Sequence, residues 1–469
     1  MTLTMPTGRA LRRAHEIAIV AAVHAAVFGS VWLLAVLVYA VVFPAAVDRT
    51  WFAIDLALIG LALGAVHARR TVLGFTSLGT NRGAKLVAIA AVALLCVVAG
   101  HLCYADWNKV TLDERNYLLT LRAGRIIPDG LTPFNLRWLM PLLAGRWNLF
   151  PVADAAALKA LNFGALVVTG FGLVLLLVRL RIPLALALAA PVFLACSYLG
   201  TYGARNRLVV DPANYALFVM LAHTLIHRRH APLFALVLLV DALNAEKAVY
   251  WIPVFAVVQL VACPRPWTWR KLRAAAKLTV YVTAPTVVYF VVLARYVAAS
   301  RLEANLCFEN LYMMSFSNLG GTVTDNVRQN GFRLLWFPFG AFTIYALLGF
   351  VYCARWMRPL VLLLIPIFTQ ALIACDTQRM LAYAFIVYLP FGYVYLARAL
   401  SDLPRWLARL MFGLVLVVAV MPQYLVYGLE WLRLTDPQTL RLYLSGLDVA
   451  VTGGLVVLHF MLFRPEPPP

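Results

Sequence analysis

Long apolar runs recur along the whole sequence. Segments such as Leu166 to Val178 and Leu410 to Met421 hold no charged side chain. A helix needs about 20 apolar residues to cross the hydrocarbon core of a bilayer, and 63% of this chain is hydrophobic while 13% is charged. A water-soluble globule is excluded by this pattern. The runs do not alternate as the strands of a membrane barrel would, so we expect an all-α, polytopic transmembrane protein.

Hydropathy predicts roughly 12 to 14 membrane helices in a single transmembrane domain, with short amphipathic helices in the outer loops. The segment Pro232 to Ala262 is interrupted by the charged residues Asp241 to Lys247, so we predict a short hairpin there. The other predicted spans are Ile17 to Phe43, Trp51 to Ala68, Lys85 to Tyr104, Ala155 to Val178, Ile182 to Gly200, Asn214 to Ile226, Ala274 to Val297, Leu334 to Cys353, Pro359 to Ala374, Met380 to Ala397, Arg405 to Tyr427 and Leu444 to Phe463.

The basic residues behind the formal charge of +20 lie mainly in the links between the predicted spans. Lys and Arg sit in short links between spans, such as Arg179 to Arg181 and Arg265 to Arg273, which the positive-inside rule places in the cytoplasm. Successive spans alternate in direction across the membrane. With residues 1–469 as one domain, this alternation puts the polar segments 105–150 and 298–333 and most of the acids on the outer face. We therefore expect a protein of the inner (plasma) membrane with extracytoplasmic chemistry and no nucleic-acid partner.

The longest polar interval, Tyr104 to Trp147, holds a pair of adjacent carboxylates. Asp113 and Glu114 precede Tyr117, Leu118 and Leu121, a spacing that predicts a short amphipathic helix at the membrane surface. Such a pair suits a general base that takes a proton from an acceptor hydroxyl, or a divalent-cation ligand beside a phosphate. The same acids also suit the first turn of a helix, where the helix dipole favours them.

Two groups of arginines accompany these acids on the predicted outer face. Arg137 precedes an apolar segment too short to span, so it could clamp a lipid phosphate bidentately or extend to a headgroup. Arg205 and Arg207 run against the charge bias of that face, which an anionic ligand would explain. Asp211 follows them and fits the capping position of a helix that has Pro212 in its first turn.

Charged residues also interrupt two apolar stretches. Asp241, Glu246 and Lys247 lie at membrane depth, where each charge costs about 2 to 3 kcal/mol unless it faces a cavity or a partner. Glu246 either lines a substrate pocket or forms a structural ion pair with Lys247 or an arginine. Asp376 and Arg379 are one helical turn apart, so they form a structural pair or present the arginine to a phosphate.

Other chemistries lack sequence support. Seven cysteines are scattered without a CxxC pair, the histidines His101, His223 and His459 are isolated, and the glycine pair Gly320 and Gly321 has no phosphate-loop context. No metal site and no cofactor are assigned, although a divalent cation beside the phosphate stays open.

The order of these motifs resembles that of the GT-C superfamily of polyprenyl-phosphate-dependent integral membrane glycosyltransferases. The similarity covers most of the chain and rests on short motifs: the acidic pair, Arg137 with Pro141 and Leu142, VDPANY from Val210, NAEKAVYWIP from Asn244, and DTQR from Asp376 leading into LAYAFIVYLP. Many members carry a large soluble C-terminal domain, which has no counterpart after the last predicted span.

The resemblance implies roles for most of the candidate residues. It implies a catalytic carboxylate in the first outer loop, with Asp113 the first choice for general base and Glu114 and Asp106 as alternates. It also implies that arginines bind the donor phosphate. These are Arg379, Arg205, Arg207 and, from its own sequence context, Arg137. The predicted substrate pocket comprises Asp211, Glu246, Asp376 and Tyr117.

We therefore expect an inverting glycosyltransferase that moves a sugar from a polyprenyl-phosphate donor to a lipid, glycan or protein acceptor. Two alternatives share the topology. A transporter or flippase of an anionic lipid-linked substrate would place ionisable groups near the midplane and show repeat halves. An outer-face glycan polymerase or ligase would use Arg and His of its outer loops.

Overall fold

The computed structural model describes residues 78–103, 112–123, 137, 139–147, 155–225, 231–261, 268–299, 342–373, 377–417 and 437–462, with a few further residues between 323 and 340. Within these ranges all regular secondary structure is helical. The all-α class is thus confirmed for the described part of the chain. The first two predicted spans, Ile17 to Phe43 and Trp51 to Ala68, lie outside it.

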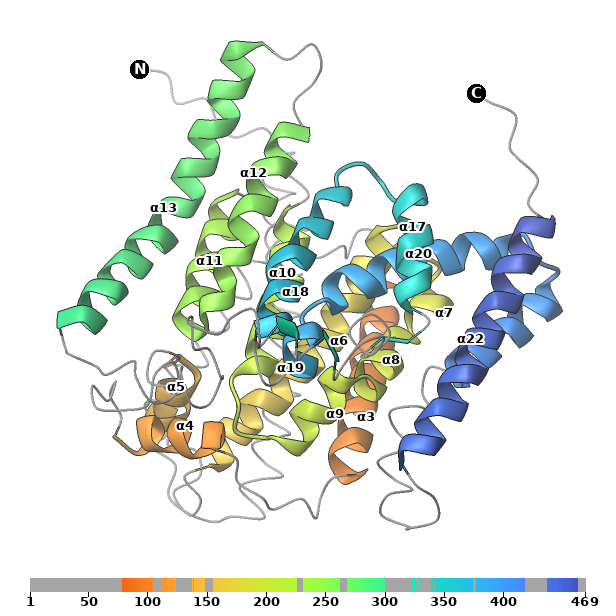
Figure 1. Ribbon diagram of the computed structural model, residues 1–469, viewed down its shortest axis with the longest axis horizontal. Coiled ribbons are helices and arrows are strands. Elements are labelled where there is room, and N and C mark those ends of the chain that lie inside the picture. Colours follow the sequence, from red (N-terminus) through yellow and green to blue (C-terminus); the bar gives the residue numbers. More distant parts are fainter. Residues whose placement is uncertain are drawn as a thin grey trace, which may run out of the picture.

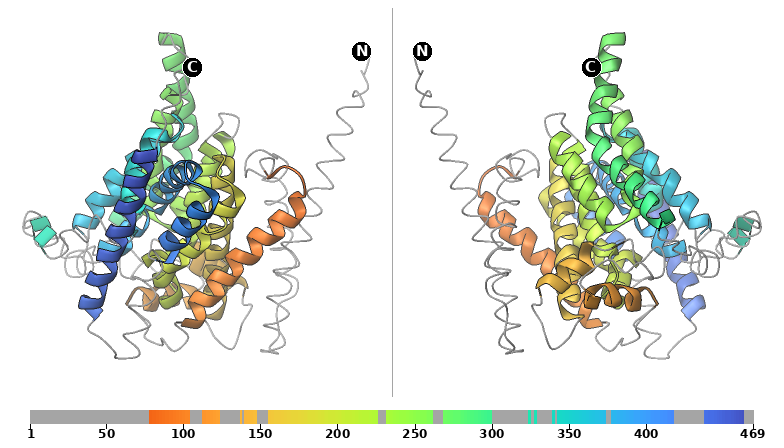
Figure 2. Two further views of the ribbon diagram at one scale, coloured as in Figure 1. Left: turned by 90° about the vertical axis from the view of Figure 1, so that its right-hand side faces the viewer. Right: turned by 90° about the vertical axis from the view of Figure 1, so that its left-hand side faces the viewer.

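Three described helices are long and apolar enough to cross a membrane. They are α3 (Arg82–Cys103), α6 (Ala156–Arg179) and α13 (Trp269–Ala299), and each matches a predicted span. Figure 2 shows α3 and α22 (Pro437–Leu462) on opposite flanks of the bundle, with α6 between them. These helices support a membrane protein, whereas the full count of 12 to 14 spans stays a prediction.

The predicted span Ile182 to Gly200 is not one helix. The chain forms three short helices there, α7 (Leu184–Ala187), α8 (Ala190–Cys196) and α9 (Tyr198–Arg205). Proline lacks an N–H and fits only the first turn of a helix. Pro183 directly precedes α7, and Pro191 lies in the first turn of α8. Ser197, which separates α8 from α9, has extended backbone angles.

Other predicted spans are also divided or shorter. Residues 358–373 form the 3₁₀ helix η6 (Arg358–Leu363) followed by α18 (Leu364–Ile373). The next predicted span is divided into α19 (Thr377–Ala382) and α20 (Phe385–Ser401). The helices α10 (Asp211–Leu225) and α17 (Phe342–Tyr352) each account for one predicted span, and residues 405–417 are helical.

The predicted break in the hairpin is confirmed. Helix α11 (Ala231–Asn244) is followed by Ala245, whose backbone is extended. The 3₁₀ helix η4 (Glu246–Tyr250) then leads into α12 (Trp251–Val261). Helices α11 and α12 both pack against α13 (Figure 1). The break brings η4 against the start of α10, where Asn244 donates a hydrogen bond to the carbonyl of Val210.

The predicted amphipathic helix of the first outer segment is α4 (Leu112–Ala123). Its Tyr117 and Leu121 are buried, whereas Arg115 and Arg122 are exposed. Helix α5 (Leu139–Trp147) packs against it, and both lie at one end of the molecule, away from the end of α12 and the start of α13 (Figure 1). A small apolar cluster joins them to the start of α6 and to residues 208–210.

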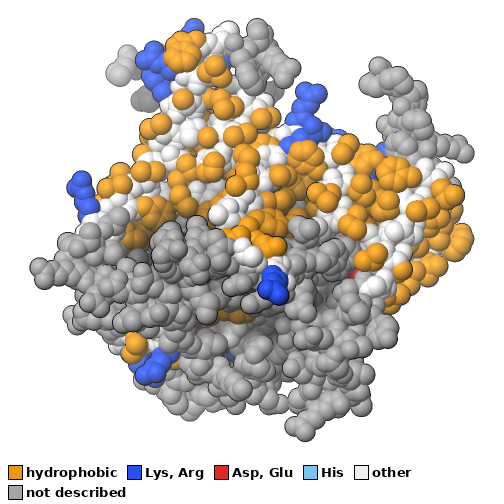
Figure 3. Space-filling view, in the orientation of Figure 1, with side chains coloured by type: hydrophobic (Ala, Val, Ile, Leu, Met, Phe, Trp, Pro, Cys, Tyr) orange, Lys and Arg blue, Asp and Glu red, His pale blue; other side chains and the backbone are white. Residues whose placement is uncertain are grey.

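Apolar side chains cover much of the described surface in Figure 3, over α13 and α22 among other helices. Val280, Tyr281, Val288 and Val292 of α13 are all exposed. Extended exposed apolar surfaces mark contacts with lipid or partners, and a lipid-facing role fits the length and composition of α13.

We expect substitution of Gly349 to destabilise the packing of α17 on α20. A Cβ at Gly349 would overlap the carbonyl oxygen of Phe391, and no side-chain rotation relieves a clash with backbone. Gly349→Ala should therefore cost about 1 to 3 kcal/mol. Gly413→Ala is the matched control because its Cβ would meet nothing within 4 Å. Thermal unfolding of the purified protein in detergent measures both; equal melting temperatures would contradict the packing.

Candidate functional site

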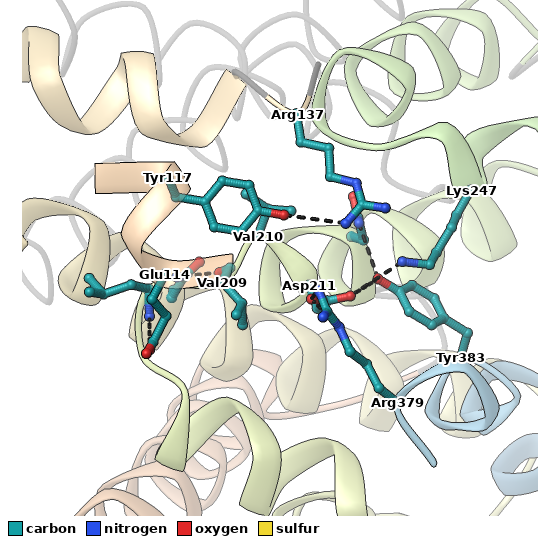
Figure 4. Close-up of polar contacts among 12 residues, drawn as sticks. Glu114, Tyr117, Arg137, Val209, Val210, Asp211, Lys247, Arg379 and Tyr383 are labelled. Carbon is teal, nitrogen blue, oxygen red and sulfur yellow. Dashed lines mark hydrogen bonds and ion pairs between the residues drawn. The ribbon is translucent and has the colours of Figure 1, made fainter. Parts of the chain in front are cut away.

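A buried cluster of ionisable side chains is centred on Asp211, the first residue of α10. Its Oδ2 accepts hydrogen bonds from Arg379 Nε at 3.0 Å and Arg379 Nη2 at 2.6 Å. Its Oδ1 accepts one from the hydroxyl of Tyr383 at 2.5 Å and lies 3.4 Å from Lys247 Nζ. Figure 4 shows these side chains converging on the carboxylate. Asp211 was expected to cap α10, and the bonds shown for its two oxygens come from side chains of other elements.

Aromatic rings and amides surround these charges. Lys247 Nζ lies 4.5 Å from the ring centre of Tyr383, and Arg379 lies 5.4 Å from the ring centre of Tyr202. Asn214 donates to the hydroxyl of Tyr383 at 3.2 Å, and Asn244 donates to Asn214 at 2.6 Å. The amides thus connect the break after α11 to α10 and to Tyr383.

Electrostatics keep Asp211 charged. Arg379 and Lys247 both contact the buried carboxylate, and Tyr383 also donates to it. A buried carboxylate with these partners is stable as an ion because each partner is a cation or a hydrogen-bond donor. Removal of one partner would leave a buried charge uncompensated.

A second ion pair adjoins the first. Arg137 donates from Nε to Glu246 Oε2 at 2.9 Å and from Nη2 to Oε1 at 2.5 Å, and from Nη1 to the hydroxyl of Tyr117 at 3.3 Å. The two partners differ in exposure, since the side chain of Arg137 is 4% exposed and that of Glu246 is 42% exposed.

The sequence neighbours Glu246 and Lys247 therefore pair with different elements. Glu246 contacts Arg137 ahead of α5, and Lys247 contacts Asp211 of α10. Of the two alternatives left open for Glu246, an ion pair with an arginine is present. Arg137, Lys247 and Arg379 are three cations against the two carboxylates of Asp211 and Glu246, so these five carry one net positive charge.

Helix α4 lies beside this cluster. Glu114 is buried, and its Oε1 accepts a hydrogen bond from the backbone N–H of Leu208 at 3.1 Å. Tyr117, one turn further along α4, reaches Arg137 (Figure 4). Asp113 belongs to α4, but its side chain lies outside the described residues. Helix α4 therefore adjoins the cluster through Tyr117 and is tied to the segment before α10 through Glu114.

The predicted site residues divide into three groups. Tyr117, Arg137, Asp211, Glu246 and Arg379 come together in the cluster, with Glu114 on the adjoining α4. The structure does not describe Asp106, Asp376 or the side chains of Asp113 and Arg205.

Arg207 is turned toward other partners. It donates to the backbone carbonyls of Ala204 at 3.0 Å and His101 at 3.3 Å, at the ends of α9 and α3. Arg379 was expected to form a structural pair with Asp376 or to be presented to a phosphate; Asp376 lies outside the described residues, and Arg379 binds Asp211.

Sequence reasoning missed Tyr383. It is four residues after Arg379, one helical turn on, and that spacing was a usable signal for a shared face. Among the described residues no group of three or more His, Cys, Asp or Glu side chains converges as metal ligands. Asp106 and the side chain of Asp113 are not among the described residues.

Comparisons with known proteins leave the chain without an assigned relative: no family model, no curated protein and no solved structure matches it.

Proposed function

We propose that the chain is an inverting membrane glycosyltransferase that moves a sugar from a polyprenyl phosphate to a lipid, glycan or protein acceptor on the extracytoplasmic face of the plasma membrane. One observation carries the proposal. Five ionisable residues between positions 137 and 379 gather in a buried cluster with a net positive charge, and this cluster adjoins the helix that bears Asp113 and Glu114.

Arg137 is the residue of the cluster best suited to hold the donor phosphate. Its guanidinium is buried, and its carboxylate partner Glu246 is the half-exposed side of the pair. A phosphate that approaches from the exposed side reaches Arg137 by replacing Glu246, with the same bidentate geometry. Arg379 is bound to the buried Asp211 and supplies positive charge close by; Arg205 and Arg207 remain further candidates.

The transfer step follows from these roles. The acceptor hydroxyl attacks the anomeric carbon, a new carbon–oxygen bond forms on the opposite face, and the bond from that carbon to the phosphate oxygen breaks. Asp113 takes the hydroxyl proton as general base, with Glu114 and Asp106 as alternates. Negative charge develops on the departing polyprenyl phosphate, and buried cations stabilise it.

A transporter of a lipid-linked anion is the second candidate, and one observation favours it. Asp241 is fully buried near the end of the broken helix α11, and neither carboxyl oxygen has a hydrogen-bond partner among the described residues. Broken helices with buried ionisable groups line the substrate sites of many transporters.

The two candidates are separated by a donor that cannot release its phosphate. Purified protein in vesicles receives a labelled sugar on polyprenyl phosphate, or an analogue with a methylene group in place of the bridging oxygen. We expect a new sugar–acceptor bond from the natural donor and no product from the analogue. Movement of both donors across the vesicle membrane, with the sugar still on its carrier, would establish the transporter and refute the transferase.

A further inference from the structure

Two surface hollows meet at the turn that follows α6. One has a volume of about 500 Å³ and the other about 620 Å³, and Arg181 and Ile182 line both. The first extends toward the start of α3 and the second toward α17 and the end of α20. They therefore adjoin where the ends of four helices come together, and we call the two hollows together the recess.

Basic side chains supply the charge of this recess. Lys85, Arg179 and Arg181 line the first hollow, Arg181 and Arg398 line the second, and the described residues of neither lining include an Asp or Glu. Lys85 and Arg179 donate to the backbone carbonyls of Leu78 at 2.7 Å and His223 at 3.0 Å. A carbonyl acceptor is neutral, so the bond to Leu78 orients Lys85 without cancelling its charge.

The remaining lining is largely apolar. Val178, Ile182 and Leu184 contribute to the first hollow, and Tyr352 and Val394 to the second. A ligand that fits this lining carries negative charge at one part and hydrocarbon at another.

Arg181 occupies a position where glycine is the favoured residue. Its φ angle is +66°, and the bonds from Ile182 N to Leu177 O and from Arg181 N to Val178 O close the end of α6 in the Schellman pattern. A side chain in this left-handed conformation costs about 1 kcal/mol relative to glycine. An exposed arginine kept at a strained position indicates a use for its side chain.

The recess lies at the other membrane boundary from the candidate active site. Helix α6 starts in the small apolar cluster that it shares with α4 and α5. Its 24 residues carry the chain about 36 Å. A hydrocarbon core is about 30 Å thick, so Arg179 and Arg181 reach the opposite headgroup region. The basic links of the sequence favour the cytoplasmic side for this end.

We propose that this recess binds the headgroup of an anionic phospholipid of the cytoplasmic leaflet. The phosphate lies against Arg181, Lys85 and Arg179, and the acyl chains follow the apolar walls. Basic pockets between helices at this boundary are suited to anionic lipid headgroups. A soluble phosphate would match the cations but would leave the apolar lining unused.

The test uses purified full-length protein in detergent and measures bound lipid by native mass spectrometry. Arg181→Gly removes the cation and also relieves the strained backbone, so it should raise the melting temperature without lipid and weaken binding of phosphatidylglycerol. We expect about a fivefold loss of affinity, which corresponds to about 1 kcal/mol for one basic residue near an anionic surface. A purely structural Arg181 would give no loss of lipid affinity.

Two substitutions serve as controls. Arg181→Lys keeps the charge and should keep most of the affinity. Arg273→Gln removes an exposed cation of α13, a helix that lines neither hollow, and should leave affinity unchanged. Equal weakening by Arg181→Gly and Arg273→Gln would overturn the site in favour of diffuse attraction. Displacement of the lipid by inorganic phosphate at equal concentration, or equal binding of phosphatidylcholine, would also overturn it.

Discussion

Replacement of Asp211 by asparagine should destabilise the protein by about 3 to 5 kcal/mol. The substitution keeps the shape of the side chain, so no cavity contributes to the loss. It removes the negative charge that Arg379 and Lys247 share inside the protein, and a buried cation without its counter-charge carries a large desolvation cost. The free energy of unfolding in mixed detergent and denaturant measures the effect.

Glu246→Gln is the matched control for this prediction. It also removes a carboxylate from an ion pair, but the described ion pair of Glu246 holds one cation, Arg137, whereas Asp211 contacts both Arg379 and Lys247. Its cost should be clearly smaller than that of Asp211→Asn. Equal costs for the two variants would contradict the central place of Asp211.

A double-mutant cycle apportions the interaction. Arg379→Gln alone leaves Asp211 short of one cation, while the combined variant carries two neutral amides at the same place. Because the two residues contact each other, the combined loss should be smaller than the sum of the single losses. Strict additivity would show that the two side chains act independently.

The composition of the cluster was largely predictable from the sequence, and its pairing was not. Charged residues in an apolar chain are costly, so Asp211, Glu246 and Arg379 stood out as functional candidates. Which cation meets which carboxylate depends on how α10, η4 and α19 pack, and local sequence does not encode that. The neighbours Glu246 and Lys247 illustrate this, because the irregular turn after Asn244 sends them to different partners.

Helix boundaries show a similar division. The hairpin break was predictable because Asp241 to Lys247 concentrate polar groups within an apolar segment. The division of residues 182–200 into three helices was missed because a hydropathy average over a window does not register a proline as a helix boundary. Pro183 and Pro191 were visible in the sequence, and the proline rules would have predicted boundaries near both.

The second prediction with a large effect concerns the proposed general base, Asp113. Asp113→Asn should lower sugar transfer by about a hundredfold to ten-thousandfold, the usual contribution of a general base, while the protein keeps its expression and fold. Glu114→Gln is the control one residue away. An amide oxygen still accepts the hydrogen bond that Glu114 takes from Leu208, so the loss of transfer should be far smaller for this variant.

The most direct measurement of the proposed activity is the rate of sugar transfer from labelled polyprenyl phosphate by three forms of the protein in vesicles. These are the wild type, Asp113→Asn and Glu114→Gln, each at equal amounts of folded protein. The proposed role of α4 beside the buried cluster predicts product from the wild type and from Glu114→Gln, with near-complete loss in Asp113→Asn. Undiminished product from Asp113→Asn, or no product from the wild type with any acceptor class, would contradict it.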